Sequence, residues 1–151
     1  MKKLILFLAM LAISGSGFSQ HLTIDKVPPA AANAFKLKFP NGSQPGWAKL
    51  SSDTFEVQFF NGKKRQGAWF NAAGNWLQTQ NEIGFGQLPA KVQNAFGKQF
   101  EDFQVQEIYE TELADKSFTY EISAFKGREN YFLVFSAKGD LLKKEQGESS
   151  E

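Results

Sequence analysis

The 151-residue chain contains no cysteine and only one histidine, His21. Without cysteine there is no disulfide, no thiolate metal ligand and no thiol nucleophile. A serine triad needs a base beside its nucleophile, and zinc or copper sites gather several His or Cys ligands. A single histidine in an N-terminal arm that we expect to be mobile supports neither. We therefore expect no catalytic residue, no metal and no cofactor, and a fold stabilised by its apolar core.

Motifs for calcium, phosphate and nucleic acids are missing as well. The acidic stretch 101–115 lacks the regular aspartate spacing of a calcium loop, and Gly84-Phe85-Gly86 lacks the third glycine and the lysine of phosphate-binding loops. The net charge of +1 gives no general attraction to nucleic acids. The run Lys63-Lys64-Arg65 is better explained by the solubility of an exposed turn, so we expect no nucleic-acid partner.

Long apolar runs are confined to the N-terminus. The run from Leu4 to Ile13 is too short to span a bilayer, a pair of lysines precedes it, and Gly17 and Ser19 place small residues where a signal peptidase reads them. Residues 1–19 are therefore predicted to be a signal peptide that is cleaved after Ser19. The mature chain from Gln20 has no second membrane-spanning candidate, so we expect a periplasmic or secreted protein without membrane insertion.

What the chain does contain is an internal repeat that is rich in phenylalanine. Phe35 recurs as Phe96 at an offset of 61 residues, and Phe60 recurs as Phe125 at an offset of 65 residues. The further matches are Val27-Pro28 with Leu88-Pro89, Ala34 with Ala95, Phe39 with Phe100, Gly62 with Gly127, Phe70 with Phe135, Gly74 with Gly139 and Leu77 with Leu142.

The repeat predicts two units, residues 20–83 and 88–146, joined by a linker at 84–87 and followed by a disordered tail at 147–151. Each unit begins with a proline that suits a first helical turn. Apolar residues then recur at i, i+3, i+4 and i+8, which is typical of one helix face. The two stripes are Ala31, Ala34, Phe35 and Phe39 in the first unit and Val92, Ala95, Phe96 and Phe100 in the second.

Four strand-like runs follow each predicted helix. Asn61-Gly62 is a strong signal for a hairpin, and Lys126-Gly127 occupies the matching place. The predicted strands are 46–51, 54–61, 64–70 and 75–80, then 103–110, 117–125, 129–136 and 140–145. The predicted fold class is α+β, with two tandem helix-plus-four-stranded antiparallel meander repeats that form one continuous eight-stranded sheet with helices on one face.

Alternation within the strands predicts two different faces of the sheet. Phe55, Val57 and Phe59 share one parity and should point toward the helices. Aromatic residues also occupy the other parity, where a one-sided sheet would show polar residues. These residues are Phe60, Trp69, Phe125 and Phe132. Either they form an exposed aromatic surface, or a bulge, a loop or the neighbouring unit buries them.

This pattern resembles the PepSY-like family, because a signal peptide precedes two units in which Val-Pro or Leu-Pro opens a helix ending in Phe. A Phe-rich meander follows, with Gly74 or Gly139 before its last strand. Tandem copies in that family resemble the fold of the β-lactamase inhibitor protein.

The resemblance implies a long antiparallel sheet with helices on one face and a concave face left open, which in the inhibitor holds a protein partner. The positions that would supply such a surface here are Phe60, Trp69, Phe125 and Phe132, with Trp47 and Trp76. Because the repeats are shorter and cysteines are absent, inhibition of a β-lactamase is not carried over.

The leading hypothesis is a non-catalytic module, a monomer or weak dimer, that holds a protein or peptide partner on this open face, with or without inhibiting it. Two rivals stay open. One is a structural protein of the cell envelope that self-associates through the same aromatic residues. The other is a carboxylate-based hydrolase, which would need a pocket between two acids. Its candidates are Glu107, Glu110, Glu112 and Glu121.

Overall fold

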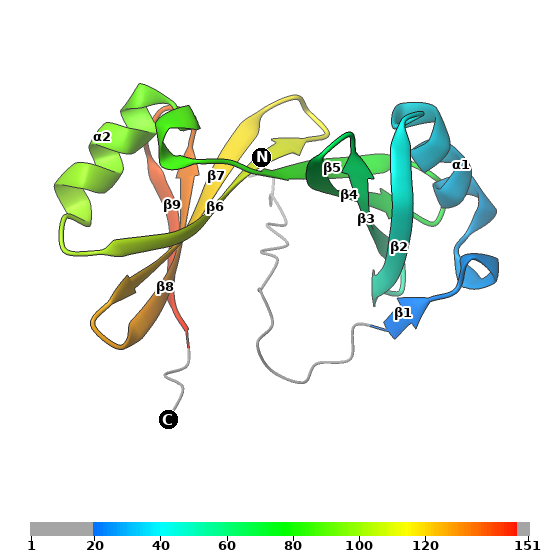
Figure 1. Cartoon of the computed structure of the whole chain (residues 1–151), viewed down its shortest axis with the longest axis horizontal. Helices are drawn as coiled ribbons and strands as arrows, with labels where there is room; N and C mark the ends of the chain where they lie inside the picture. Colours follow the sequence, from blue (N-terminus) through cyan, green and yellow to red (C-terminus); the bar gives the residue numbers. More distant parts are fainter. Residues whose placement is uncertain (1–19, 148–151) are drawn as a thin grey trace, which may run out of the picture.

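The computed structural model describes residues 20–147 and shows an α+β fold, a single nine-stranded antiparallel sheet with two α-helices (Figure 1). Every strand pairs with the next one in the chain, from β1 to β9. In chain order the elements are β1 (Gln20–Leu22), the 3-10 turn η1 (Ile24–Lys26), α1 (Pro29–Lys38), β2 (Gly42–Ser51), β3 (Thr54–Asn61), β4 (Lys64–Asn71), β5 (Trp76–Glu82), the 3-10 turn η2 (Phe85–Gln87), α2 (Ala90–Gln99), β6 (Gln104–Leu113), β7 (Phe118–Lys126), β8 (Glu129–Ser136) and β9 (Leu141–Gln146).

The prediction of an eight-stranded sheet was one strand short. Residues expected to form a mobile arm form β1, in which His21 pairs with Ala48 of β2. The predicted signal peptide lies outside the described residues, and so does the predicted tail except for Gly147. The N–H of Gly147 donates a hydrogen bond of 2.8 Å to the carbonyl of Asn130, so this first residue of the predicted tail is bonded to β8. Across residues 20–147, none of the helices has the length and apolar character needed to cross a membrane.

Both helices begin and end where the sequence indicates. Pro28 and Pro89 occupy the N-cap positions, where a missing N–H breaks no helical hydrogen bond. At the C-terminal end of α1, the N–H of Phe39 donates a hydrogen bond of 2.8 Å to the carbonyl of Phe35. At the end of α2, the N–H of Phe100 donates a bond of the same length, 2.8 Å, to the carbonyl of Phe96. The aromatic rings that end the two helical stripes pack on strand residues, Phe39 on Phe59 and Phe100 on Phe135.

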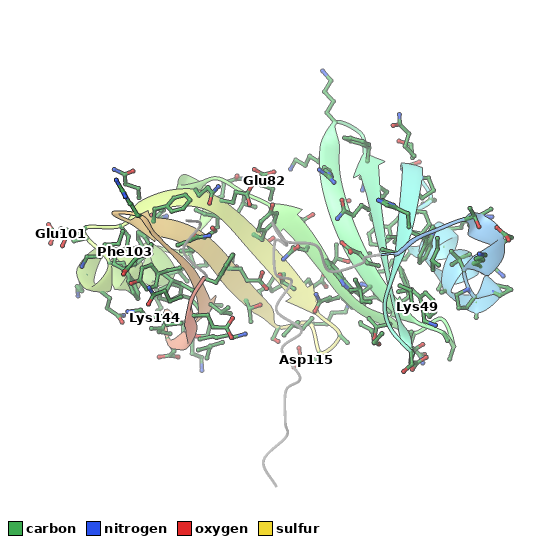
Figure 2. All side chains as sticks on the ribbon, turned by 90° about the horizontal axis from the view of Figure 1, so that it is seen from below. Lys49, Glu82, Glu101, Phe103, Asp115 and Lys144 are labelled. Atoms are coloured by element: carbon green, nitrogen blue, oxygen red, sulfur yellow. The ribbon has the colours of Figure 1, made fainter. Side chains whose placement is uncertain are left out.

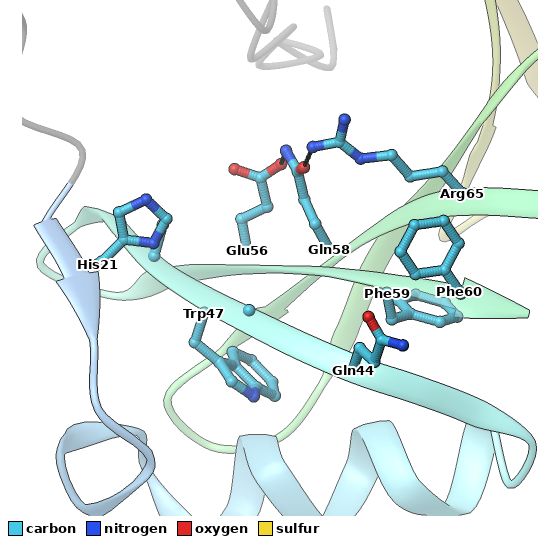
Figure 3. A pocket seen from close by; sticks show the side chains of 10 residues that line it. His21, Gln44, Trp47, Glu56, Gln58, Phe59, Phe60 and Arg65 are labelled. Atoms are coloured by element: carbon cyan, nitrogen blue, oxygen red, sulfur yellow. Dashed lines mark hydrogen bonds between the residues drawn. The ribbon is translucent and has the colours of Figure 1, made fainter.

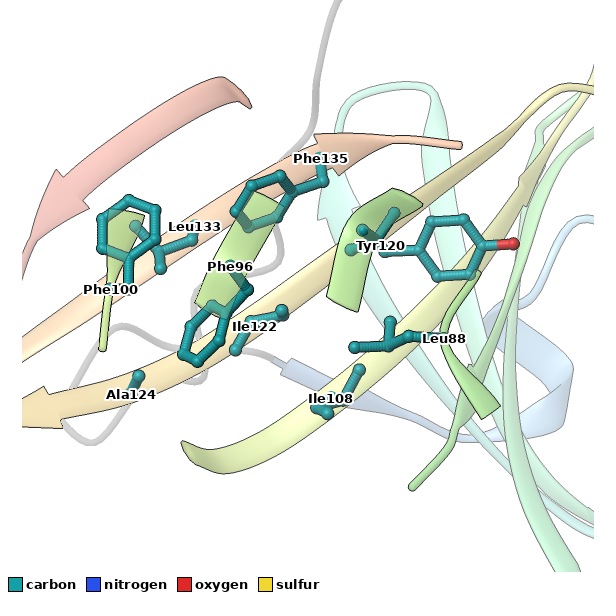
Figure 4. Close-up of a cluster of buried hydrophobic side chains, with 10 residues drawn as sticks. Leu88, Phe96, Phe100, Ile108, Tyr120, Ile122, Ala124, Leu133 and Phe135 are labelled. Carbon is teal, nitrogen blue, oxygen red and sulfur yellow. The ribbon is translucent and has the colours of Figure 1, made fainter. Parts of the chain in front are cut away.

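The buried side chains form two hydrophobic clusters. The α1 cluster consists of Val27, Ala31, Phe35, Trp47, Phe55, Val57, Phe59, Ala68 and Phe70. The α2 cluster consists of Leu88, Val92, Phe96, Phe100, Ile108, Tyr120, Ile122, Ala124, Leu133 and Phe135 (Figure 4). The predicted inward parity of β3 is therefore confirmed, because Phe55, Val57 and Phe59 all belong to the α1 cluster.

One glycine in each half of the chain allows the helix of that half to pack closely on the sheet. Gly74 has φ of +87°, and a Cβ there would lie 2.6 Å from the carbonyl oxygen of Ala30 in α1. Gly139 has φ of +88° and would bring a Cβ equally close to the carbonyl oxygen of Lys91 in α2. Both positions combine a left-handed backbone with a contact to helix backbone, so only glycine fits without displacement.

The two halves of the chain meet where β5 pairs with β6. Beside this junction the Trp76 ring contacts two ammonium groups, with Lys38 Nζ of α1 at 3.8 Å and Lys116 Nζ of the β6–β7 turn at 4.6 Å from its centroid. Lys116 also forms an ion pair of 3.2 Å with Glu112. Cation–π contacts therefore connect the first helix to the second half of the sheet through one indole.

We expect Gly74→Ala to lower the free energy of unfolding by about 3 kcal/mol, because the new methyl adds a backbone clash to the cost of a left-handed alanine. Gly62→Ala is the matched control, since Gly62 has φ of +63° but no neighbouring atom within 4 Å of the place that a Cβ would take. That control should cost only about 1 kcal/mol. Urea denaturation of both variants measures the difference, and equal losses would contradict the proposed helix contact.

Candidate functional site

A second face of the sheet is formed by residues that alternate with the two hydrophobic clusters. In β3, Glu56, Gln58 and Phe60 alternate with the buried apolar residues, and cross-strand partners continue the same face through the sheet. We call this surface the open face. Its further members include Arg65, Gly67, Trp69, Gln78, Gln80, Glu82, Glu107, Tyr109, Thr111, Glu121, Ser123, Phe125, Phe132, Val134, Lys143 and Glu145.

The predicted aromatic residues of the open face differ in their exposure. Phe60 is 39% exposed, and Phe125 and Phe132 are half-buried. Trp69 is only 1% exposed, because its indole lies over Gly67, where a Cβ would meet the ring at 3.1 Å. Trp69 is therefore buried beneath this face, and the exposed aromatic surface of the face comes from the phenylalanines.

Trp47 and Trp76 do not lie on the open face, and their predicted position there is wrong. Trp47 is buried in the α1 cluster, with its ring centroid 5.8 Å from that of Phe35. Trp76 is half-buried and packs against the same cluster. The physical cause is register, since Trp47 pairs with Val57 and Trp76 pairs with Phe70, and both partners face the helix.

A polar row that the sequence did not reveal crosses the open face beside Trp69. Gln58 Nε2 donates a hydrogen bond of 2.9 Å to Glu56 Oε1, and the guanidinium of Arg65 donates to Gln58 Oε1. Glu56 is only 4% exposed. Burial raises the pKa of Glu56 above its usual value, and the hydrogen bond from Gln58 and the charge of Arg65 oppose this shift.

This row borders a hollow of about 480 Å³ on the open face near β1 (Figure 3). The hollow exists because Gly46 and Ala48 of β2 present almost no side chain between the longer residues around them. The side chains of His21, Glu56, Gln58 and Arg65 rise around it, whereas the Trp47 ring points to the helix side. The residues that line it are His21, Gln44, Gly46, Trp47, Ala48, Glu56, Gln58, Phe59, Phe60 and Arg65.

A second polar group lies on the open face at the β5–β6 junction. Gln80 Nε2 donates a hydrogen bond of 3.1 Å to Glu121 Oε2 and lies 3.5 Å from Thr111 Oγ1. Burial raises the pKa of Glu121 to about 7, while the hydrogen bond from Gln80 and the charge of Lys143 oppose the shift. Glu121 is therefore a carboxyl group that changes its charge near neutral pH.

The open face has an excess of negative charge. Its strands place five carboxylates there against two cations, which are Arg65 and Lys143. Glu82 lies near the middle of the sheet, between the α1 end marked by Lys49 and the α2 end marked by Lys144 (Figure 2). The five carboxylates are those of Glu56, Glu82, Glu107, Glu121 and Glu145.

The four acids considered for a hydrolase do not share one face. Glu107 and Glu121 lie on the open face, whereas Glu110 and Glu112 pair with Tyr120 and Phe118 on the opposite side of the same strands. None of them lines the hollow, where Glu56 is the single carboxylate among the described lining residues. Among the described residues, the lining of the hollow therefore offers one buried carboxyl group and not the pair of acids that a carboxylate-based hydrolase needs.

The fold is thus a single antiparallel sheet with two helices and one partly aromatic, polar face. The sequence matches the family model described as beta-lactamase-inhibitor-like, PepSY-like over residues 53–143, which is more than half of the chain. The chain therefore belongs to the PepSY-like family. No curated protein matches it in sequence.

Solved structures from Bacteroides share this fold. A protein of Bacteroides eggerthii DSM 20697, described as periplasmic, has a TM-score of 0.74 and 22% identity, covering 80% of this chain and 88% of its own. A DUF2874 family protein of Bacteroides ovatus ATCC 8483 has a TM-score of 0.71 and 22% identity, covering 79% and 86%. A BLIP-like protein of Bacteroides fragilis NCTC 9343 has a TM-score of 0.67 and 23% identity, covering 81% and 89%.

We expect the free energy of unfolding to fall as the pH rises through the range from 4.5 to about 7. The pKa of Glu121 is raised from 4.5 to about 7 in the folded protein, so folding favours its protonated form and loses stability when the carboxyl ionises. With allowance for partial solvent screening, the loss is about 2 kcal/mol.

Glu121→Gln keeps a hydrogen-bond partner for Gln80 and removes the ionisation. At pH 8 the free energy of unfolding of this variant should therefore exceed that of the wild type by about 2 kcal/mol. At pH 4 the two should be equal. Urea denaturation from pH 4 to 8 checks this, with Glu101→Gln as a control at an exposed turn. A Glu121→Gln profile parallel to that of the wild type would contradict it.

Proposed function

We propose that this protein is an exported, non-catalytic binding module that holds a protein or peptide partner on its open face. The observation that carries the proposal is the open face itself, a surface outside both hydrophobic clusters, where the partly exposed Phe60 borders the hollow and the half-buried Phe125 and Phe132 lie further along the same face. Aromatic residues over a rigid sheet offer contact area at a low cost in conformational entropy.

The proposal includes a tandem arrangement in which both helices cover the same side of the sheet. Residues directly opposite each other in paired strands share a face. Val57 pairs with Ala68, Ala68 with Thr79, and Thr79 with Glu112 of β6. Glu110 lies two residues from Glu112, and therefore on the same face of β6, and it pairs with Tyr120. This series begins in the α1 cluster and ends in the α2 cluster, which supports one helix-covered side and one side free for a partner.

The equivalent glycines support the same arrangement. Gly74 approaches Ala30 of α1 as Gly139 approaches Lys91 of α2, with nearly equal φ angles and the same 2.6 Å spacing. Because this contact needs glycine in both places, it indicates two copies of one structural unit rather than a chance resemblance of sequence.

An extracytoplasmic location belongs to the proposal. Related folds include a Bacteroides eggerthii protein described as periplasmic. In the present chain, the short apolar run before Gly17 and Ser19 is typical of a secretory signal. We propose that the chain is exported and works in the periplasm or outside the cell.

Capture of partners from a cell-envelope extract tests the binding face. The double variant Phe60→Ala, Phe132→Ala removes two open-face rings, and we expect it to recover at least tenfold less of a specific partner than the wild type does, because such anchors dominate binding energy. Trp69 is unsuitable for this purpose, since replacing a side chain that is 1% exposed would disturb the fold.

The control is Leu37→Ala in α1, where the side chain is 84% exposed and lies away from the open face. Circular dichroism should show that all three proteins are folded. If the control loses the partner as strongly as the open-face variant does, the binding site lies elsewhere. If the partner recovered is the protein itself, and sedimentation shows a dimer that the open-face variant abolishes, the self-associating structural role is correct instead.

A further inference from the structure

The hollow on the open face contains a negative charge that the protein leaves without a cation. Glu56 is 4% exposed and accepts a hydrogen bond only from the neutral amide of Gln58 among the bonds described. The ion pairs within the described part of the chain involve Glu112, Asp102 and Glu145, and none involves Glu56. A buried carboxylate without a cation is destabilising, which is why burial raises its pKa.

Arg65 does not fill this role. Its guanidinium donates to the far side of Gln58 and the residue is exposed, so the amide separates the two charged groups. Figure 3 shows Gln58 between Glu56 and Arg65, and His21, another lining residue of the hollow, on the other side of Glu56. The carboxylate is thus held at the wall of an empty space, with its nearest positive charge displaced by one side chain.

The shape of the hollow suits a long side chain with a charged end. Gly46 and Ala48 leave the floor low, so that a side chain can lie along it, and Phe60 supplies an apolar wall that is 39% exposed. Lysine and arginine side chains adopt this arrangement when they are partly buried, because the alkyl stem packs on an aromatic ring and the cation reaches a carboxylate.

The charge of the surrounding surface favours the same ligand. The strands of the open face present five carboxylates against two cations, and the charges of Glu107 and Glu82 add to burial in raising the pKa of Tyr109. A surface of this sign attracts basic protein segments and repels acidic ones, which affects both the rate of association and the choice of partner.

We propose that the hollow is a subsite for one basic side chain, a lysine or arginine, of the partner, with its cation at Glu56 and its stem along Phe60 over Gly46 and Ala48. This inference rests on the proposed function, because it names the group by which a partner on the open face is recognised. Pairing with a ligand cation removes the energetic penalty of the buried carboxylate, so the residue that costs stability in the free protein supplies specificity in the complex.

Titration of the 15N-labelled protein with short peptides tests the subsite directly. The probes are three blocked pentapeptides, alanine throughout except for a central lysine, a central norleucine or a central glutamate. We expect the lysine peptide to shift the amide signals of Gly46, Ala48 and Gln58 with millimolar affinity. The norleucine and glutamate peptides should bind at least tenfold more weakly, since they lack the cation.

Glu56→Gln removes the charge and retains the shape, and it should weaken the lysine peptide at least tenfold. Glu107→Gln is the matched control, because it removes one open-face carboxylate outside the hollow and should change the affinity less than twofold. If the two variants lose the same affinity for the lysine peptide, general surface charge explains the binding and the subsite is wrong. Tighter binding of the glutamate peptide, or signal shifts confined to other residues, would also overturn the subsite.

Partner capture by the variants separates the role of Glu56 from that of the open-face phenylalanines. If Glu56→Gln captures the envelope partner as well as the wild type does, while the Phe60→Ala, Phe132→Ala variant does not, the open face binds its partner without a basic side chain at Glu56. If the lysine peptide binds the hollow but no partner depends on the phenylalanines, the subsite stands and the proposed face for partner proteins is wrong.

Discussion

The pairing of β5 with β6 is the constraint on which the rest of the structure depends. Each half has one helix and a small hydrophobic cluster, and a unit of about 60 residues is only marginally stable on its own. Pairs from Gln78 with Leu113 to Glu82 with Tyr109 make the two halves into one sheet. Trp76 and its two lysines reinforce this junction on one side, and Gln80 with Glu121 does so on the other. A continuous open face exists only because these strands are joined.

Much of the fold was predictable because its strongest signals are periodic. The helical stripe that ends at Phe39 and the alternation around Val57 follow from regular backbone geometry and hold over many residues. β1 was not predictable, since three residues are too few to show a period and its stability comes from pairing with β2. The extra strand shows that edge elements depend on their neighbours more than on their own sequence.

The candidate site was less predictable than the fold. Phe60 and Phe132 were found by parity. Trp47 and Trp76 were assigned to this face by the family resemblance alone, and the register of their strands, which contains bulges in β2 and between Trp69 and Phe70, places them on the opposite side. Glu56 was missed for another reason. A glutamate in an alternating strand is typical of a solvated position, whereas Glu56 is only 4% exposed and pairs across the strands with Trp69, a neighbour that the pattern within one strand does not record.

The three tryptophans occupy three distinct environments, which gives the protein a built-in set of optical reporters. Trp47 is enclosed by the α1 cluster, Trp69 lies beneath the open face, and Trp76 contacts the ammonium groups of Lys38 and Lys116. Their fluorescence is therefore a composite of core, open face and junction. Proteins retaining one tryptophan at a time would resolve loosening of the core, occupation of the face and separation of the halves as separate spectral events.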